Sequence, residues 1–595
     1  MLDVNDATAP ISVLITPEPV RPEDFDQRRP VHETAAFWAV IGLAALMTLW
    51  RLDRNGFGNP YYAAVARSGS ASWHAFWYGS FDPAGFITLD KAPLGFWLPG
   101  LAVRFAGMGT WPLLAPQAIC CIATVAVINH LVRRRFGWVA GTIAGVLLAL
   151  TPAFVITARF NGPDAFFVLL LALAAWAAIL AIELDTRSHI VFCALFLSLA
   201  FTTKMLEAAV VLPGFVLAYL VAGKGDWARK VLRLMLGALV LGFGGAVWLF
   251  LVNRIAPTNR PFIGGSGDNS AWGLVTSHFD GGPLYAGDRS ATRLFNLEVG
   301  SQIAWLIPLA VTGVVAVVAA RWRRSSDDPA RANAVLWAGW LVGYGIAFSA
   351  APGVVQPYFT AAMAPAVAAL SAIGIVVIGR RLDRWPWRLL GVAATLAATA
   401  SAIGIAHRTP DWNSWLRPAV IIIALVVVAL VAADASRRAT LGVAVFAATL
   451  CPMLWSASAL LHPADPINPI AGPSRAITAP ALIDTQLVSY IEGARGDARF
   501  LLATIGMEAA APIIVDTDEP VMAMGGFRGD DDVPTLDALR IMIDSGEVRF
   551  VLTDNNPAAG GRWAPVLQER CVVVAPALYG SVLASPQLWQ CAPKT

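Results

Sequence analysis

Long runs of hydrophobic residues recur along the first 461 residues of the chain, separated by short polar turns. A helix needs about 20 mostly apolar residues to cross the hydrocarbon core of a bilayer. By this criterion we predict about thirteen membrane-spanning helices. They cover Ala35–Trp50, Pro112–Val132, Trp138–Ala158, Ala165–Ile182, Ile190–Thr203, Met205–Ala222, Val231–Val252, Ile303–Ala320, Ala334–Ala350, Tyr358–Ile378, Leu389–Ala406, Pro418–Ala433 and Leu441–Leu461.

Basic residues are distributed unequally between the turns at the two ends of these helices, and they favour the cytoplasmic side of a membrane. With residues 1–34 as a cytoplasmic segment, the short outer turns hold far fewer basic residues than the inner ones: Arg159, Lys204, Arg408 and Arg417. The inner turns hold Arg133, Arg134, Arg135, Arg187, Lys224, Arg229, Lys230, Arg321, Arg323, Arg324, Arg331, Arg380, Arg381, Arg384, Arg437 and Arg438. We therefore expect a multi-pass protein of the inner (plasma) membrane with a cytoplasmic N-terminus.

The apolar run Pro93–Met108 does not fit this orientation as a span, because counting it would invert every later turn. We interpret it as an interfacial helix, which also suits Arg104 within it. Residues 35–461 then form a transmembrane domain with outer loops at 51–110 and 253–302.

Residues 462–595 differ from the rest of the chain, because charged residues return and short apolar runs alternate with helical patterns. We predict a small extracytoplasmic α/β domain after a Pro/Gly-rich linker, Pro463–Pro473. Cys571 and Cys591 both fall in it, and we expect them to pair if the compartment is oxidising. Its strands are predicted at Arg499–Ile505, Pro512–Asp516, Val548–Asp554 and Cys571–Pro576, and its helices at Thr485–Gly493 and Thr535–Gly546.

The composition agrees with a membrane protein. Of the 595 residues, 57% are hydrophobic and 14% charged, and the mean hydropathy is +0.61, whereas soluble domains are about a quarter charged. The net charge of +3 does not favour a nucleic-acid binder. No Cys/His spacing resembles a zinc site, and no phosphate loop is present.

Polar residues that carry chemistry gather in the outer turns, so they can converge on one cavity. Asp90 and Lys91 end the first outer loop, where a carboxylate can act as a general base and an ammonium can hold a phosphate. The alternative to a catalytic role for Asp90 and Lys91 is an ion pair at the membrane interface. The alternative for Arg159 and Lys204 is that their side chains extend along the helix ends to reach the interface. The other polar residues of these turns are Asn59, Tyr61, Tyr62, Asp82, Arg159, Asn161, Asp164, Lys204, Gln356 and Tyr358.

Four further features are interpreted as structural. His74 and His278 are expected to be surface or hydrogen-bonding histidines. The Gly264–Ser270 segment is expected to be a plain glycine-rich turn, although its N–H groups could cradle an anion. Gly529–Asp532 is expected to be a solvated acidic loop, with a cation site as the alternative.

The order of these motifs is similar to that in a known superfamily. A first span, the loop-ending sequence Asp90-Lys91-Ala92-Pro93, the turn Arg159–Asp164 and the turn Gln356-Pro357-Tyr358 follow one another. The chain thereby resembles the GT-C polyprenyl-phosphate-sugar glycosyltransferases. The nearest branch is family-39-like, related to protein O-mannosyltransferases and the lipid A aminoarabinose transferase. A bacterial subgroup named as putative transferases is most similar, and the resemblance includes the tail segment Glu519–Phe527.

The resemblance implies a GT-C fold and transfer of a sugar, commonly with inversion, from a polyprenyl-phosphate donor to an envelope acceptor: a lipid, a glycan or a protein. The relatives' acid at the start of the first outer loop is replaced here by Gly58-Asn59. Asp82 or Asp90 is therefore expected to act as base, with Asp164 as an orienting carboxylate. Lys91, Arg159 and Lys204 are expected to bind the donor phosphate, and Asn59, Tyr61, Tyr62, Asn161, Gln356 and Tyr358 the substrates.

A divalent cation shared by carboxylates and phosphate is compatible with this chemistry, but no dedicated ligand set assigns one. Two other classes of function remain open at this stage. One is a transporter or flippase for lipid-linked sugars, although no internal repeat typical of transporters is found. The other is a non-catalytic envelope scaffold, which the missing acid at Gly58-Asn59 leaves open.

Overall fold

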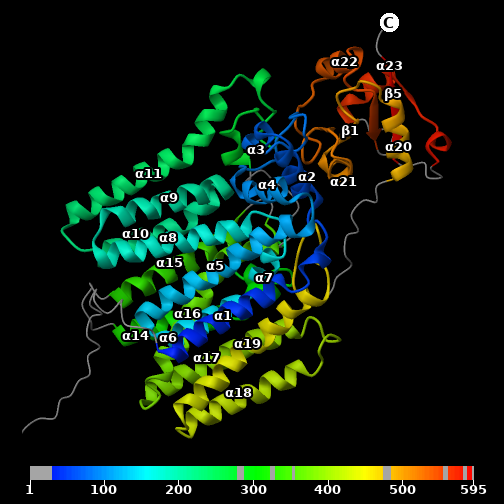
Figure 1. Ribbon diagram of the computed structural model, residues 1–595. Helices are drawn as coiled ribbons and strands as arrows, with labels where there is room; N and C mark the ends of the chain where they lie inside the picture. The colour runs from blue at the N-terminus through cyan, green and yellow to red at the C-terminus, as the bar shows by residue number, and fades with distance from the viewer. Residues whose placement is uncertain are drawn as a thin grey trace, which may run out of the picture.

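A helical bundle carries a small α/β domain at one end (Figure 1). The computed structural model describes residues 30–277, 287–321, 329–351, 355–473, 484–553, 561–580 and 586–592. Most of the expected cytoplasmic segment, together with His278, Arg323 and Arg324, lies outside the described residues.

The long helices of the bundle follow the predicted apolar runs. They are α1 (Val31–Leu49), α5 (Thr110–Phe136), α6 (Trp138–Ala149), α7 (Pro152–Ala158), α8 (Asp164–Leu184), α9 (Arg187–Lys204), α10 (Leu212–Ala222), α11 (Trp227–Arg254), α14 (Ile307–Arg321), α15 (Pro329–Ala350), α16 (Ala364–Gly379), α17 (Trp385–Ala406), α18 (Leu416–Ala432) and α19 (Arg437–Leu461). Short 3₁₀ segments η3 (Met205–Val211) and η6 (Pro357–Met363) lead into α10 and α16. Each predicted span therefore falls mainly on helical residues.

The predicted count of thirteen spans is not confirmed. Among the described residues, nine helices are long and apolar enough to cross a membrane, or ten if α6 and α7, bent by 66°, form one span. One of these nine candidates is Arg187–Ala222, a stretch of 36 residues that contains both α9 and α10. However, Met205 has φ +47°, and Arg233 contacts both Asp185 before α9 and Tyr219 near the end of α10. Hence the chain reverses its direction between α9 and α10.

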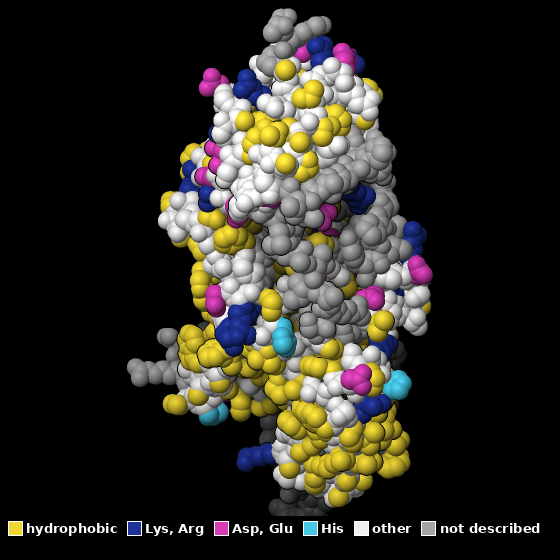
Figure 2. Space-filling model, turned by 90° about the vertical axis from the view of Figure 1, so that its right-hand side faces the viewer, with side chains coloured by type: hydrophobic (Ala, Val, Ile, Leu, Met, Phe, Trp, Pro, Cys, Tyr) yellow, Lys and Arg dark blue, Asp and Glu magenta, His cyan; other side chains and the backbone are white. Residues whose placement is uncertain are grey.

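The outward faces of the bundle are apolar, as a bilayer requires. Leu239 and Phe243 on α11 and Ile422 and Leu425 on α18 are at least 60% exposed. Figure 2 shows hydrophobic side chains covering much of the lower part of one side of the molecule. The chain is thus a multi-pass membrane protein by the character of its surface as well as by its helices.

Three short helices pack at the end of the bundle that carries the α/β domain. They are α2 (Pro60–Ala71), α3 (Trp73–Tyr78) and α4 (Leu94–Ala106). The α4 helix has 13 residues and corresponds to the apolar run interpreted as interfacial. Its Arg104 donates a hydrogen bond to the Gly69 carbonyl at 2.9 Å and lies 4.0 Å from the centre of the Trp73 ring. Arg104 therefore ties α4 to α2 and α3.

The arginine-rich turns gather at the opposite end of the bundle. Arg133 pairs with Glu33 at the start of α1, Arg134 pairs with Glu183 at the end of α8, and Arg380 donates to the Phe136 carbonyl. The unequal distribution of basic residues in the sequence therefore corresponds to the two ends of the folded bundle.

The C-terminal domain contains one five-stranded sheet with strand order β2-β1-β3-β5-β4. Strand β1 pairs in parallel with β2 and β3, whereas β5 is antiparallel to both β3 and β4. The elements are α20 (Thr485–Ala494), β1 (Leu502–Ile505), α21 (Met507–Thr517), β2 (Val521–Met524), α22 (Leu536–Asp544), β3 (Phe550–Thr553), α23 (Ala564–Arg570), β4 (Cys571–Val573) and β5 (Gln587–Cys591). The predicted small α/β domain is confirmed.

One predicted strand of this domain is wrong, because Pro512–Asp516 lies within helix α21. Its apolar residues, Ile514 among them, form one buried helical face with Met507 and Ala510. Strands β2 and β5 were not predicted. The expected disulfide joins Cys571 to Cys591, the first residue of β4 and the last of β5.

The loops between these elements carry short segments that position the site. They are η2 (Leu52–Asn55), η4 (Pro257–Asn259), α12 (Gly273–Ser277), η5 (Arg293–Phe295), α13 (Gly300–Ile303), η7 (Gly561–Trp563) and η8 (Pro576–Tyr579).

Candidate active site

Helix α2 begins where the relatives' acid is missing, and two asparagines build this start. The Asn59 side chain caps the helix by accepting the N–H of Tyr61 at 2.9 Å. Asn161 accepts the N–H of Asn59 at 2.8 Å and donates to its carbonyl at 2.9 Å. Gly58 has φ +68°, and a Cβ there would lie 2.6 Å from Asn161 Oδ1. Asn59 and Asn161 therefore hold α2 in place and thereby position Tyr61 and Tyr62.

Asp90 and Lys91 form an ion pair that Tyr61 orients. Lys91 Nζ lies 2.7 Å from Asp90 Oδ1. The Tyr61 hydroxyl donates to the same oxygen at 2.9 Å and accepts the Asp90 N–H at 2.8 Å. Burial by itself lowers the pKa of Lys91, but the neighbouring Asp90 and Tyr62 raise it above its ordinary value, so the ammonium stays charged.

The Lys91 ammonium is surrounded by aromatic rings. Their centres lie 5.9 Å (Tyr61), 5.7 Å (Tyr62) and 5.7 Å (Phe527) from Nζ. An ammonium within about 6 Å of a ring centre is attracted by the π electrons of the ring. Phe527 belongs to the C-terminal domain, so two domains meet at this side chain.

A second charged group lies at the start of α8. Lys204 Nζ contacts Asp164 Oδ1 at 2.7 Å and Glu207 Oε2 at 2.8 Å, and it lies 3.8 Å from the centre of the Phe359 ring. Among the described residues, Asp164 Oδ2 and Glu207 Oε1 are buried without a hydrogen-bond partner. These two oxygens can accept hydrogen bonds from a ligand.

Tyr62 connects the two charged groups. Burial raises the pKa of its phenol; the charges of Lys91 and Lys204 lower that pKa, and those of Asp90 and Asp164 raise it. The charges of both groups therefore act on one hydroxyl. Ring contacts join the two groups: the Phe160 ring lies 5.9 Å from the Tyr62 ring and 5.4 Å from the Tyr358 ring, and the Phe359 ring lies 3.8 Å from Lys204 Nζ.

Arg159 does not join this centre, contrary to the sequence-based expectation. Its guanidinium donates to the carbonyls of Thr48, Trp50 and Arg51 at the end of α1, at 2.8 to 3.2 Å. The side chain is only 1% exposed. The geometry fits a cap for the last carbonyls of a helix, and it does not present Arg159 to a phosphate.

Asp82 is also separate from the centre. Its Oδ2 accepts the N–H groups of Phe86 and Ile87 in its own loop, and the residue is fully buried. Its Oδ1 is buried without a hydrogen-bond partner among the described residues, but no ammonium group of these residues lies beside it as one does at Asp90 and Asp164. Burial raises its pKa to about 6, although these two hydrogen bonds lower it. The Asp82 side chain therefore binds the backbone of its own loop, whereas Asp90 faces Lys91 and Tyr61.

The remaining predicted residues lie at the edge of the site or apart from it. Tyr358 is buried and packs on Phe160, with ring centres 5.4 Å apart. Gln356 has a buried Oε1 that lacks a partner in the described part of the chain. His74 packs on Tyr78 at 4.8 Å. Within the described ranges, no group of three or more His, Cys, Asp or Glu side chains is arranged to hold a metal ion.

Two residues of the site were missed as site residues by sequence reasoning. Glu207 follows Lys204 by three positions, the spacing at which helical side chains meet, so this signal could have identified it. Phe527 follows two glycines, Gly525 and Gly526, but it is 436 positions from Lys91 in sequence. Nothing local in the sequence connects Phe527 to the site.

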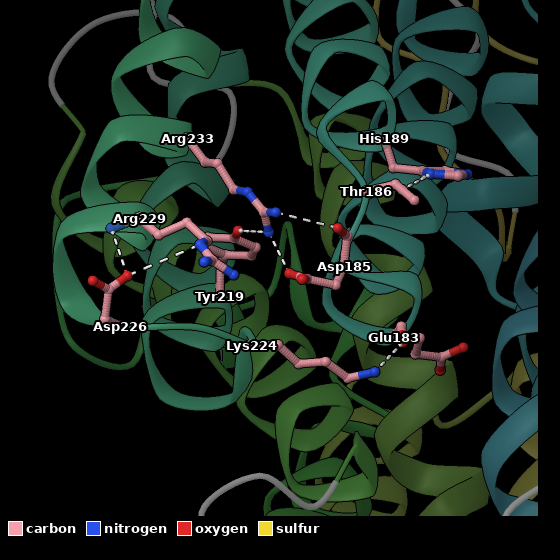
Figure 3. A network of polar contacts seen from close by, with 9 residues as sticks. All are labelled: Glu183, Asp185, Thr186, His189, Tyr219, Lys224, Asp226, Arg229 and Arg233. Carbon is pink, nitrogen blue, oxygen red and sulfur yellow. Dashed lines mark hydrogen bonds and ion pairs between the residues drawn. The ribbon is translucent and has the colours of Figure 1, made fainter.

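A different polar network occupies the other end of α8. Figure 3 shows Arg233 directed at Asp185 and Lys224 directed at the Glu183 carbonyl. The Glu183 carboxylate lies 2.6 Å from Arg134 Nε and 2.5 Å from Arg135 Nε. Both of its oxygens therefore have basic partners within the protein.

An apolar groove lies away from both networks, between α14, α16, α17, α18 and α19. Its lining includes Leu306, Ile375, Ala398, Val427 and Ala448, and it contains no charged side chain. It can hold hydrocarbon, but it offers no group for proton or phosphate chemistry.

Two segments of the chain match known family models. Residues 90–249 match "Dolichyl-phosphate-mannose-protein mannosyltransferase", and residues 487–567 match "Putative mannosyltransferase YkcB-like, C-terminal". The first segment includes Asp90, Lys91, Asp164, Lys204 and Glu207. The second includes Phe527, so both parts of the site lie in matched segments.

Relatives and solved structures resemble the chain over most of its length. "Putative mannosyltransferase YycA" of Bacillus subtilis is 27% identical over 88% of this chain and 92% of its own. "Putative mannosyltransferase YkcB" of the same organism is 27% identical over 88% and 89%. ArnT from Cupriavidus metallidurans in the apo state superposes with a TM-score of 0.56, at 16% identity, over 94% of this chain and 99% of its own. The same protein bound to undecaprenyl phosphate gives a TM-score of 0.53 at 15% identity, over 95% and 99%.

The structural likeness shows the fold, and the family matches add the glycosyltransferase character. The resemblance indicated by the sequence is therefore confirmed: the chain has a GT-C fold and carries, in two separate parts, segments that match mannosyltransferase families.

Proposed function

We propose that the protein transfers a sugar from a polyprenyl-phosphate donor to a lipid, glycan or protein acceptor of the cell envelope. The observation that carries this proposal is that ring contacts through Tyr62, Phe160 and Tyr358 join the Asp90–Lys91 pair to the Asp164–Lys204 pair. This brings carboxylates and ammonium groups together at one aromatic site. The ArnT structure bound to undecaprenyl phosphate supports a donor of this chemical class.

In the proposed reaction, the acceptor hydroxyl attacks the anomeric carbon of the donor sugar while the bond from that carbon to the phosphate oxygen breaks. The acceptor's proton goes to the Asp90 carboxylate, and polyprenyl phosphate leaves with the bonding electron pair. Lys91 and Lys204 neutralise the charge that develops on the phosphate. A single displacement of this kind inverts the anomeric configuration.

The other groups orient the reactants. The Tyr61 hydroxyl fixes Asp90 by donating a hydrogen bond to its carboxylate and accepting one from its backbone N–H. Asp164 Oδ2 and Glu207 Oε1 accept hydrogen bonds from hydroxyl groups of the sugar. These bonds would satisfy two buried oxygens that have no partner in the described structure. Tyr358, whose ring packs on Phe160, borders this space.

We place the site at the outer face of the plasma membrane, because the basic turns at the opposite end of the bundle favour the cytoplasm. The N-terminus is then cytoplasmic and the C-terminal domain extracytoplasmic. The Cys571–Cys591 disulfide of that domain supports an oxidising compartment.

The test incubates the purified full-length protein with a panel of polyprenyl-phosphate sugars, together with lipid, glycan and protein acceptors of the cell envelope, and follows the release of polyprenyl phosphate by mass spectrometry. We expect turnover of one donor class, and Asp90→Asn should reduce it by at least about 100-fold, the usual contribution of a general base. Asp383→Asn, an exposed carboxylate, provides the matched control and should retain wild-type turnover. Lack of donor consumption across the panel would contradict the proposal.

A further inference from the structure

The loop Gly525–Val533 of the C-terminal domain extends from the end of β2 towards the site. The Gly525 N–H donates to the Val533 carbonyl at 2.7 Å, and the Asp531 N–H donates to the Gly525 carbonyl at 3.0 Å, so the loop closes on itself. Gly525 has φ +77°, and a Cβ there would lie 2.4 Å from the backbone of Gly529. The sequence can form this tight loop because glycine occupies that position.

Phe527 projects from this loop onto the site. The centre of its ring lies 4.9 Å from that of Tyr61 and 5.7 Å from Lys91 Nζ. The residue remains 43% exposed. Part of the ring therefore packs on the site, and part is open to an incoming molecule.

Asp531 connects the same loop to the second outer loop. It is 8% exposed, and its Oδ2 accepts the Gly265 N–H at 2.8 Å. A Cβ on Gly265 would lie 3.0 Å from the Asp90 Cβ, so this glycine-rich turn lies directly against Asp90. In this structure, the N–H of Gly265 already has a carboxylate partner, and the turn acts as a support for Asp90.

The rest of the domain is firmly docked on the first outer loop. Arg499 donates to the Ala84 carbonyl at 3.0 Å, and Arg67 on α2 pairs with Asp518 at 2.7 Å. A single apolar cluster includes residues of both parts, among them Phe81 and Ile514. The position of Phe527 over Lys91 is therefore fixed by a broad interface.

We propose that the C-terminal domain completes the active site, with Phe527 as the aromatic surface on which a sugar ring of the substrate packs beside Lys91. The apolar C–H face of a sugar fits an aromatic ring, while its hydroxyl groups reach charged neighbours such as Lys91 and Asp90. Asp531 is a positioning residue, because it acts through Gly265 on Asp90. This inference rests on the proposed glycosyltransferase function and assigns a specificity role to a domain outside the bundle.

The experiment compares Phe527→Ala, Phe527→Leu and Phe527→Tyr in the full-length protein, using the donor that the wild type consumes. Ile541→Ala is the control, because Ile541 is an exposed apolar residue, 66% accessible, on α22 of the same domain. We expect Phe527→Ala to raise the KM for the substrate whose sugar packs on the ring, donor or acceptor, by about tenfold, with a smaller change in kcat. This is the effect of losing one contact at a binding centre. Phe527→Tyr should remain within about twofold of the wild type because it keeps the ring.

Two assays identify which sugar packs on the ring. If it is the donor sugar, the KM for donor hydrolysis without acceptor rises as well; if it is the acceptor sugar, only the KM for the acceptor rises. Either result supports the proposal. Limited proteolysis of the domain reports whether each variant keeps its docking.

The proposal is overturned if Phe527→Ala matches Ile541→Ala in both KM values, or if Phe527→Leu, docked but without a ring, matches the wild type. Phe527→Leu also decides the case in which Phe527→Ala loses its docking, since a docked leucine variant with a raised KM supports the role of the ring. A wild type that consumes no donor contradicts the proposed function and this inference together, whereas an active wild type with unaffected ring variants contradicts this inference alone.

Discussion

The two ends of helix α8 carry carboxylates that are equally buried but differ in how many of their oxygens have partners. The side chains of Asp164 and Glu183 are 4% and 3% exposed, and both contact basic residues. Glu183 has a separate arginine on each oxygen. Asp164 has Lys204 on one oxygen, whereas the other has no partner among the described residues, and the same holds for neighbouring Glu207.

This difference separates a structural ion pair from a site. Buried polar atoms in folded proteins nearly always have partners, so an unpaired buried acceptor calls for an explanation such as an absent ligand. The partner type differs as well, because one guanidinium nitrogen of each of two arginines contacts Glu183, while Lys204 is a compact charge beside the Phe359 ring. A pair with spare acceptors and aromatic neighbours can receive a substrate, and a saturated pair cannot.

The largest effect expected from this comparison is on activity at the open end. Asp164→Asn should lower turnover about 100-fold, because it removes a charged acceptor for the substrate and the carboxylate that orients Lys204. Stability should change little, since Lys204 keeps Glu207. Donor turnover measured beside the thermal unfolding midpoint checks this. Wild-type turnover in Asp164→Asn would remove the distinction between the two ends.

The closed end should show the reverse pattern. Glu183→Gln leaves Arg134 and Arg135 without a countercharge, and breaking a buried ion pair by removing one partner costs about 4 kcal/mol. Turnover per folded molecule should stay at the wild-type level, because the site lies at the other end of α8. Unfolding measurements in the same detergent, together with the donor assay, test both parts. A specific loss of turnover without loss of stability would assign a functional role to this end.

Much of the open end could be predicted from sequence, because hydropathy alone places Asp164 and Lys204 on the same side of the membrane. Asp90 and Lys91 were recognisable as a pair because they are neighbours in the sequence. Hydropathy cannot tell whether a polar residue in a turn faces a cavity or its own backbone, and this is why Arg159 and Asp82 were assigned to the site. Phe527 could not be found, since its place depends on how the C-terminal domain docks.

The fold shows the same limit at a smaller scale. Apolar runs long enough to span a membrane identify helices directly, so the bundle follows the sequence closely. In the C-terminal domain the run at Pro512–Asp516 has only five residues, too few to distinguish a strand from one face of a helix. There the burial of α21 against β1 and β2 decides the structure.

Arg159 allows the structural and functional interpretations of a buried cation to be separated. Arg159→Met should destabilise the protein by about 3 kcal/mol, because the α1 carbonyls that it caps would lose buried hydrogen bonds. The KM for donor should remain unchanged in the folded fraction. Thermal unfolding and donor kinetics test this expectation, with Arg417→Met, a partly exposed basic residue at the start of α18, as control. A raised donor KM without loss of stability would restore Arg159 to phosphate binding.

Asp82 should give the smallest effect, visible mainly in the dependence of stability on pH. Its pKa is raised from 3.8 to about 6 in the folded protein, first of all by burial. Between pH 4 and pH 6 the folded state therefore binds more protons at this group than the unfolded state, so the free energy of unfolding falls as the pH rises, by about 2 kcal/mol, and is level above that range. Asp82→Asn retains an oxygen for the N–H groups of Phe86 and Ile87 and should lack this decline. Unfolding midpoints of both proteins from pH 4 to pH 7 measure the difference.

Donor turnover at pH 7 should be the same for the wild type and Asp82→Asn. Loss of turnover in a folded Asp82→Asn variant would make Asp82, and not Asp90, the base.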